Sequence, residues 1–405
     1  MLFLVSFGII TNVNGNVRNV CGYRYAFSTA NPCRSLLLKE LGEAYISCGL
    51  VGAALPLFEA AEVWDSLIVC YRLLEKTDVA EQLVRQRLEI SPNDPKLWCT
   101  LGDLLNANTC YEEAWRRSGS RSARAQRSLA RSEMRSEHYE KAAQHWRLAL
   151  NLSPLHSEAW FSLGWSLMKL EDFSGAAEAL TRLVQMEPDD GRAWNNLAMV
   201  HMKLEHWDEA FIALGEATKH ARETWQMWEN YAAVAVKVEE YPTAVRALDH
   251  MVSLTRGDNV DLDVLGSLTT RVNQHPEDTH LVEGLGKIFK KIAASSKGSG
   301  MAAFWAFCSQ YHETLGSKEA STECLSRQLR CLQSSRWQEQ EDAFTQYSKA
   351  CLALVESYMA NGNARELSQA RLLLRNTVQR ATEYFNDHQC YMELCDKLEE
   401  LKSKQ

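Results

Sequence analysis

The stretch AWFSLGWSLMKLEDFSGAAEAL, residues 159–180, decides the fold, because AWNNLAMVHMKLEHWDEAFIAL at 193–214 repeats its pattern 34 residues later. Each stretch opens on an Ala-Trp pair and places a small residue, Gly164 or Ala198, four residues after the tryptophan. A fixed period of this length is the signature of stacked structural repeats. The sequence therefore predicts a tandem array.

The same step of 34 residues extends over four windows, which open at Ala123, Ser157, Gly191 and Trp225. Three slots recur in them. The first holds the tryptophans Trp160, Trp194 and Trp228; the second holds the small residues Ala130, Gly164, Ala198 and Ala232; the third holds the aromatic residues Tyr139, Phe173, Trp207 and Tyr241. Two helices can cross closely only where small residues lie, and one hairpin cannot bury its large residues alone. We therefore expect stacked helical hairpins.

These slots resemble those of the tetratricopeptide repeat family. The helix-ending proline of its pattern is present at Pro154 and Pro188, where it ends a second helix because it lacks an N–H group. The resemblance implies an all-α fold, a right-handed α-solenoid of tandem hairpins with irregular helices at the C-terminal end. It also implies a protein-binding scaffold.

The expected organisation follows from where the pattern begins and fades. We expect a poorly ordered leader at 1–34, an array at 35–256, a helical spacer and flexible joint at 257–300, and degenerate or capping hairpins at 301–405. Within the array the predicted repeats lie near 35–60, 61–94, 95–122, 123–156, 157–190, 191–224 and 225–256.

The N-terminus and the cysteines bear on the compartment. The apolar run MLFLVSFGII lacks a preceding basic residue, which argues against a secretory signal, although that alternative stays open. The chain has 12 cysteines without zinc-site spacing, and we interpret them as reduced thiols. We expect a cytoplasmic protein that is also present in the nucleus.

No catalytic pattern stands out. The sequence has no phosphate-binding glycine loop, no His-Glu-x-x-His motif and no nucleophile elbow. We therefore predict a protein that is not an enzyme, with no cofactor and no metal site. The net charge of −8 disfavours membrane and nucleic-acid partners in general.

An arginine stripe departs from the surrounding composition. Its members are spaced by three or four residues, which places them on one helical face: Arg121, Arg124, Arg127, Arg131 and Arg135. Like charges at this spacing destabilise a helix slightly, so stability does not explain the stripe. It is either a patch for an acidic peptide, since arginine binds carboxylates through two donors, or a face that is solvated or neutralised by a neighbouring hairpin.

Further groove candidates share repeat positions. Bases end successive first helices at Arg135, Lys169, Lys203 and Lys237, where they also complement helix dipoles. Asn196 and Asn230 share a slot that can bond a peptide backbone. Phe161 and Trp165 are expected either to anchor a ligand side chain or to pack in the core.

Some members of the family are co-chaperones that clamp the acidic tails of Hsp70 or Hsp90 with Lys and Asn side chains. Here the match is partial: Arg127 and Arg192 fall in basic slots, Arg131 and Ser162 replace two asparagines, and Asn196 replaces a base. The resemblance implies acidic or extended protein segments as partners and a looser link to chaperone-assisted assembly of large complexes. The alternatives are contact with RNA or a ribonucleoprotein through the stripe, and an accessory fragment of a larger enzyme.

Overall fold

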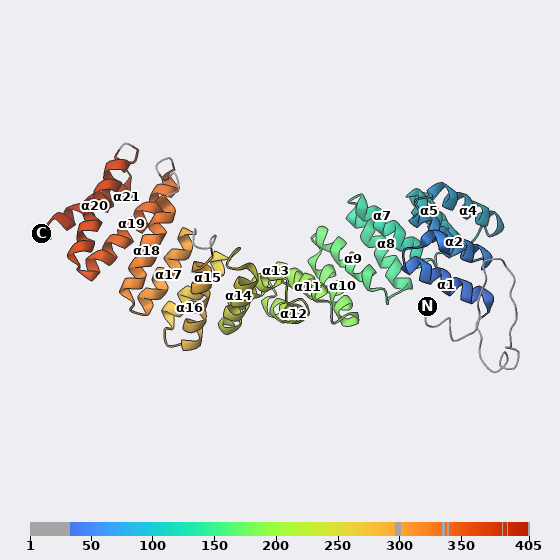
Figure 1. Ribbon diagram of the computed structural model, residues 1–405, viewed down its shortest axis with the longest axis horizontal. Helices are drawn as coiled ribbons and strands as arrows, with labels where there is room; N and C mark the ends of the chain where they lie inside the picture. Colours follow the sequence, from blue (N-terminus) through green and yellow to red (C-terminus); the bar gives the residue numbers. More distant parts are fainter. Residues whose placement is uncertain are drawn as a thin grey trace. The chain divides into compact units, whose positions relative to one another are not determined.

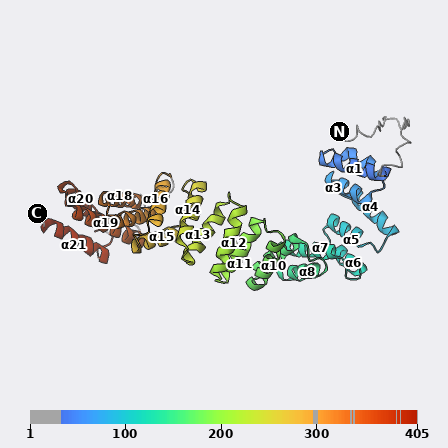
Figure 2. The same ribbon diagram turned by 90° about the horizontal axis from the view of Figure 1, so that it is seen from below.

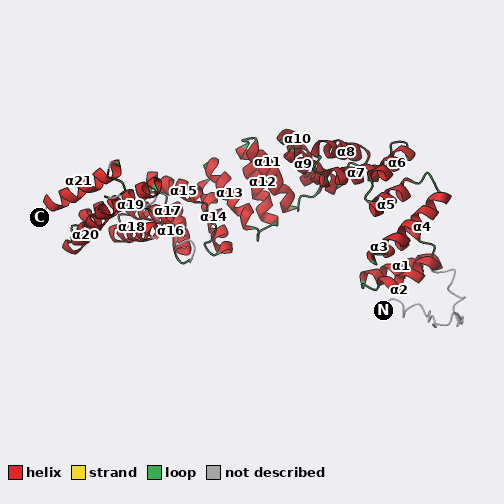
Figure 3. Ribbon diagram, turned by 90° about the horizontal axis from the view of Figure 1, so that it is seen from above, coloured by secondary structure: helices red, strands yellow, loops and turns green. Residues whose placement is uncertain are grey.

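The computed structural model describes residues 33–295, 301–333, 337, 340–382, 384–386 and 388–403. The expected leader, up to residue 32, and most of the expected joint, 296–300, lie outside these ranges. In the described ranges the secondary structure consists of helices, without a strand (Figure 3). The chain forms two compact units, divided between Pro154 and Leu155, and each is described by itself.

The described part of the first unit contains four helical hairpins (Figure 1). Their helices are α1 (Arg34–Ser47), α2 (Val51–Ala60), α3 (Trp64–Leu73), α4 (Thr77–Ile90), α5 (Pro95–Leu105), α6 (Asn108–Arg117), α7 (Ala123–Arg135) and α8 (Tyr139–Leu152). Helix α6 is short, with 10 residues where α8 has 14. The predicted repeat at 95–122 is itself only 28 residues long, which leaves less room for its second helix.

The second unit continues with helices that follow one another in chain order (Figure 2). They are α9 (Ser157–Lys169), α10 (Phe173–Met186), α11 (Gly191–Lys203), α12 (Trp207–His220), α13 (Trp225–Lys237), α14 (Tyr241–Thr255), α15 (Leu262–Gln274), α16 (Thr279–Ala293), α17 (Ala302–Thr314), α18 (Lys318–Gln333), α19 (Glu341–Asn361), α20 (Ala364–Ala381) and α21 (Gln389–Ser403).

The predicted register is confirmed. Helices α7, α9, α11 and α13 begin at the residues that open the four windows, and α8, α10, α12 and α14 begin at the aromatic slot. The small slot lies at the helix crossing, because a Cβ atom on Gly164 would lie 2.9 Å from Cγ of Leu180 in α10. Ala130 and Ala198 in the same slot are fully buried.

A hydrogen bond, as well as apolar packing, explains why tryptophan occupies the first slot. The indole Nε1 of Trp98 donates to the Pro92 carbonyl at 2.8 Å, and Trp194 donates to Pro188 at the same distance. Each bond joins a first helix to the loop that precedes it, so the tryptophan holds that loop against the helix. Phenylalanine in this slot would fill the space but lose the bond.

The turn inside each of the four hairpins from α7 to α14 uses a left-handed glutamate. Glu137, Glu171, Glu205 and Glu239 have φ of 60°, 60°, 60° and 64°. Each lies two residues beyond the end of a first helix, where glycine is usual because it has no Cβ. The chain therefore accepts a small conformational cost at every one of these turns.

Beyond α14 the packing changes, although the hairpins continue. Three extra residues before Leu262 break the step of 34, since Leu262 opens α15 at 37 residues after Trp225. Counted from the helix start, the slots persist: the large residues are Leu265, Trp305 and Phe344, and the small buried ones are Thr269, Ser309 and Ser348. The segment expected as a helical spacer thus forms the hairpin α15–α16.

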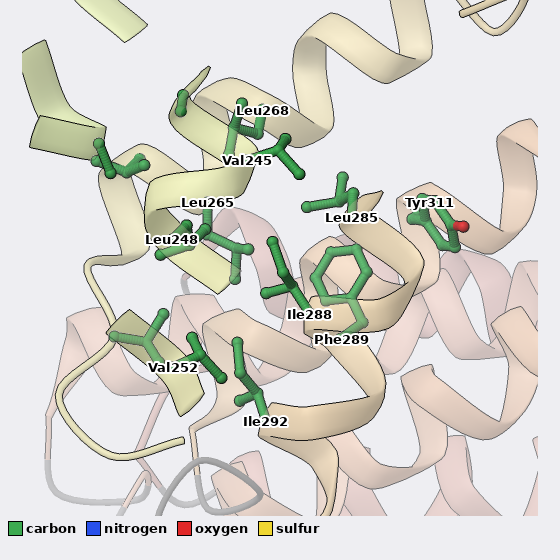
Figure 4. Packing of buried hydrophobic residues seen from close by; sticks show 14 of the residues in the cluster. Val245, Leu248, Val252, Leu265, Leu268, Leu285, Ile288, Phe289, Ile292 and Tyr311 are labelled. Atoms are coloured by element: carbon green, nitrogen blue, oxygen red, sulfur yellow. The ribbon is translucent and has the colours of Figure 1, made fainter. Parts of the chain in front are cut away.

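This hairpin is an integral part of the core of the second unit. Whereas α10 packs on α11 and α12 packs on α13, α14 packs on α16. Figure 4 shows Val245, Leu248 and Val252 of α14 facing Leu285 and Ile288 of α16. Gly284 allows this approach, because a Cβ there would lie 2.6 Å from Cγ1 of Val245.

Candidate partner-binding surface

The first helices of the first unit form a cleft with a basic rim. It has a volume of 200 Å³ and is lined by α3, α5 and α7. We call it the basic cleft, and its defining residues are Ile68, Val69, Arg72, Lys96, Leu104 and Arg124. Asp65 and Thr100 also line it. Three bases against one carboxylate therefore surround an apolar floor.

Arg124 is the member of the predicted arginine stripe that reaches this cleft. Its Nη2 lies 3.0 Å from Oδ2 of Asp103 in α5, and the other carboxylate oxygen of Asp103 accepts a bond from Tyr111 at 2.8 Å. Burial and the Asp103 carboxylate raise the pKa of the Tyr111 phenol. The neighbouring hairpin thus partly neutralises Arg124, as one of our two interpretations of the stripe expects.

The rest of the stripe does not form one uniform helical face. Arg121 precedes the N-cap Ser122 and lies outside α7, which corrects the expectation that five arginines share that helix. Arg127 is half-buried, Arg131 is exposed, and Arg135 donates to Oδ1 of Asn106 at 3.3 Å. The stripe therefore has at least two members with partners on α5 or its C-cap.

Two further bases complete the cleft. Arg72 lies in the last turn of α3, and Lys96 lies in the first turn of α5. Both are exposed, and within the described ranges neither forms an ion pair. We did not predict them, because each stands alone in its own helix. Only the stacking of the repeats, which brings successive first helices together, places these two bases beside Arg124.

In the second unit, α9 carries two exposed aromatic residues. Phe161 and Trp165 are 38% and 40% exposed, so they lie on the surface and not in the core. The Nζ of Lys169 lies 5.0 Å from the Trp165 ring, a cation–π contact. These three side chains are spaced by four residues and share one face of the helix.

The remaining predicted residues lie on α11 and α13. Asn196 and Asn230 are half-buried, and the Nδ2 of Asn230 lies 3.5 Å from the Met199 sulfur. Arg192 is exposed and lies 3.6 Å from the N-cap carboxylate of Asp190. Lys203 and Lys237 are the last residues of their helices and are exposed. Helix-dipole complementation accounts for both lysines, and their role in binding stays a prediction.

The cysteines in the described part of the chain are mostly buried. Across the described residues, no group of three His, Cys, Asp or Glu side chains is placed to hold a metal ion. The described cysteines are free thiols, and burial raises the pKa of Cys99 to about 11. None of the described helices is both long enough and apolar enough to span a bilayer.

The comparisons with known proteins agree with this architecture. A tetratricopeptide repeat family model matches residues 127–170 and 161–224. The chain is similar to the tetratricopeptide repeat protein 27 homolog of Dictyostelium discoideum, with 42% identity over 34% of this chain and 16% of that protein. It is also similar to the tetratricopeptide repeat-containing protein trd-1 of Caenorhabditis elegans, with 37% identity over 29% of this chain and 15% of that protein. The matched segments thus span about a sixth of each relative.

Among solved structures, YrrB, described as a TPR protein with an unusual peptide-binding site, is 21% identical and covers 44% of this chain and 93% of its own, with a TM-score of 0.40. MamA is 16% identical and covers 43% of this chain and 94% of its own, with a TM-score of 0.36. The sequence matches carry the conclusion: residues 127–224 match a tetratricopeptide repeat family model, and about a third of the chain is similar to the tetratricopeptide repeat protein 27 homolog.

Proposed function

We propose that this protein is an interaction scaffold that captures acidic, extended segments of partner proteins in the basic cleft. One observation carries the proposal: three successive first helices bring Arg72, Lys96 and Arg124 to the rim of one cleft with an apolar floor. Binding a partner segment requires only such a surface and no reacting group. The repeats of related proteins support the general class, since tetratricopeptide repeat proteins are generally non-catalytic scaffolds.

The cleft selects its ligand by charge and by size. Arg72 and Lys96 have no acidic partner in the described structure, so a ligand carboxylate gains contacts without breaking an internal ion pair. Arginine can hold a carboxylate with two parallel bonds. Ile68 and Leu104 offer apolar contact area, and the volume of 200 Å³ suits a single side chain better than a folded element.

The finer proposal concerns the partners. We propose a role in chaperone-assisted assembly of large complexes in the cytoplasm and the nucleus, with acidic tails of the Hsp70 or Hsp90 type as candidate ligands. The proposal rests on the basic cleft and on the general habit of such repeats. Because the chain matches only 16% of its relative in Dictyostelium discoideum, the activity of the whole protein stays part of this proposal.

Fluorescence anisotropy with a labelled acidic peptide tests the cleft. The variant Arg72→Glu/Lys96→Glu is expected to bind at least about tenfold more weakly, equivalent to about 1.4 kcal/mol. The control Lys76→Glu/Lys141→Glu changes charge equally on exposed residues of the same unit and is expected to bind like the wild type. If both variants lose the same affinity for the peptide, net charge and not the basic cleft explains the loss.

The same assay separates the peptide mode from an RNA mode. The logarithm of the binding constant for a single-stranded RNA falls linearly with the logarithm of the salt concentration, because phosphate contacts release counterions. A peptide with an apolar anchor depends on salt less steeply. If the chain binds labelled RNA more tightly than the acidic peptide at physiological salt, the RNA interpretation replaces the one proposed here.

A further inference from the structure

A second cleft lies on the side of the second helices, between α16 and α18, with α17 as its floor. On the other side, α15 packs on α17, where the absent side chain of Gly266 admits the Phe307 ring. A Cβ on Gly266 would lie 2.9 Å from that ring. We call the cleft between α16 and α18 the outer cleft. It has a volume of 550 Å³ and shares no residue with the basic cleft.

Three nearly buried aromatic rings line the outer cleft. Trp305, Tyr311 and Phe289 line it and are 4%, 6% and 4% exposed. Tyr311 is fixed by a bond from its hydroxyl to the Val282 carbonyl at 2.9 Å. Gly286 leaves room for that hydroxyl, since a Cβ there would lie 2.5 Å from it. A ligand therefore meets a preformed surface and orders little of the protein on binding.

The two walls of the outer cleft differ in charge. On α18, Arg327 pairs with Glu323 and stacks 4.8 Å from the Trp305 ring. On α16, Lys287 and Lys290 are exposed, and in the described structure neither forms an ion pair. Glu283 also belongs to the lining of the cleft. The α16 wall thus presents two cations, three residues apart, with which no carboxylate of the described structure forms an ion pair.

The outer cleft also borders a half-buried histidine, His312. The Nδ1 of His312, a residue that lines the outer cleft, is buried without a hydrogen-bond partner. Burial and the nearby Lys290 lower the pKa of His312, so its ring is neutral at neutral pH. The Nδ1 of His201, at the same position in α11, is likewise buried without a partner, so this atom is a feature of the repeat and the proposal below does not use it.

We propose that the outer cleft is a docking site for an acidic amphipathic helix of a partner protein. Its volume is within the range of ligand pockets and exceeds what one side chain fills. A groove between two helices suits a helical ligand, whose apolar residues would lie over Trp305 and Tyr311. Lys287 and Lys290 lie one turn apart, so acidic residues one turn apart on the ligand complement them. This proposal does not rest on the basic cleft.

The test uses the full chain with Arg72→Glu/Lys96→Glu, so that the basic cleft is already impaired. The probe is a fluorescein-labelled amphipathic helical peptide with leucines on one face and glutamates beside them. In this background, Lys287→Glu/Lys290→Glu is expected to weaken binding about tenfold. The control Lys318→Glu/Lys349→Glu alters exposed lysines of the same unit outside this cleft and is expected to have no effect.

Further variants and probes make the test decisive. Ala320→Trp inserts a large side chain into the cleft wall and is expected to block binding while circular dichroism stays that of the wild type. A matched peptide with lysines in place of glutamates is expected not to bind. No binding of the acidic peptide, or binding that the Lys287→Glu/Lys290→Glu and Ala320→Trp variants leave unchanged, overturns the proposal. Equal binding of the basic peptide overturns it too.

Discussion

Replacing Gly164 by leucine is expected to destabilise the second unit by about 3 kcal/mol or more. The first added carbon would already lie 2.9 Å from Cγ of Leu180, and Leu180 is 1% exposed, so neither helix has free space to yield. The three further carbons of leucine must push α9 and α10 apart. Because each hairpin packs on the next, this separation also disturbs the contact between α10 and α11.

Gly164→Ala is the matched control. The equivalent pairs Ala198 with Leu214 and Ala232 with Leu248 show that alanine is accommodated opposite a buried leucine at this slot. Alanine also gains about 1 kcal/mol of helix propensity over glycine. We therefore expect the alanine variant to differ from the wild type by about 1 kcal/mol or less.

Urea denaturation followed by far-ultraviolet circular dichroism measures both changes. The expected order of midpoints is alanine close to the wild type and leucine far below. The reasoning is refuted if the leucine variant unfolds at the wild-type midpoint, because the small slot would then not lie at the helix crossing.

Three other predictions use the same denaturation assay. Glu171→Gly is expected to stabilise the protein by about 0.5–1 kcal/mol, because glycine adopts the left-handed conformation of this turn without strain. Glu178→Gly inside α10 is expected to destabilise the protein by a similar amount. Changes of the same sign in both variants would contradict this account. Trp194→Phe should cost about 1 kcal/mol or more through loss of the bond to Pro188, and Trp165→Phe at the exposed site should cost less; a larger loss at Trp165 would reverse our assignment. Burial lowers the pKa of His201 in the folded protein. Its contribution to stability is therefore complete above the unfolded pKa of about 6.5 and is lost as the pH falls below that value. His201→Gln should flatten this decline in stability, and an unchanged pH profile would show that the His201 ring does not cause it.

The hairpin array was predictable from the sequence because its landmarks are large, buried and regularly spaced. The helix starts at Ser157 and Gly191 follow directly from the period. The hairpin of α15 and α16 was harder to predict, because a loop of three extra residues moved Leu265 and Thr269 out of step with the earlier slots. Periodicity detects only constant spacing, while packing depends on position within each helix.

The candidate site was less predictable than the fold. The arginine stripe suggested a basic groove, and Arg124 lies in one. Its partner Asp103 and the bases Arg72 and Lys96 come from other hairpins, so no spacing within one helix reveals them. The exposure of Phe161 and Trp165 also required the structure, since a large aromatic residue on a repeat helix has the same pattern whether it packs inward or faces solvent.

The most direct test of the central claim is affinity capture of partners from cytosol, identified by mass spectrometry. Wild-type protein is compared with Arg72→Glu/Lys96→Glu and with the control Lys76→Glu/Lys141→Glu. Arg124 is left intact, because a carboxylate there would face Asp103 and disturb the packing of α5 on α7. The account predicts that a discrete set of proteins with acidic segments disappears only from the cleft variant. A partner list that is unchanged in the folded cleft variant would contradict it.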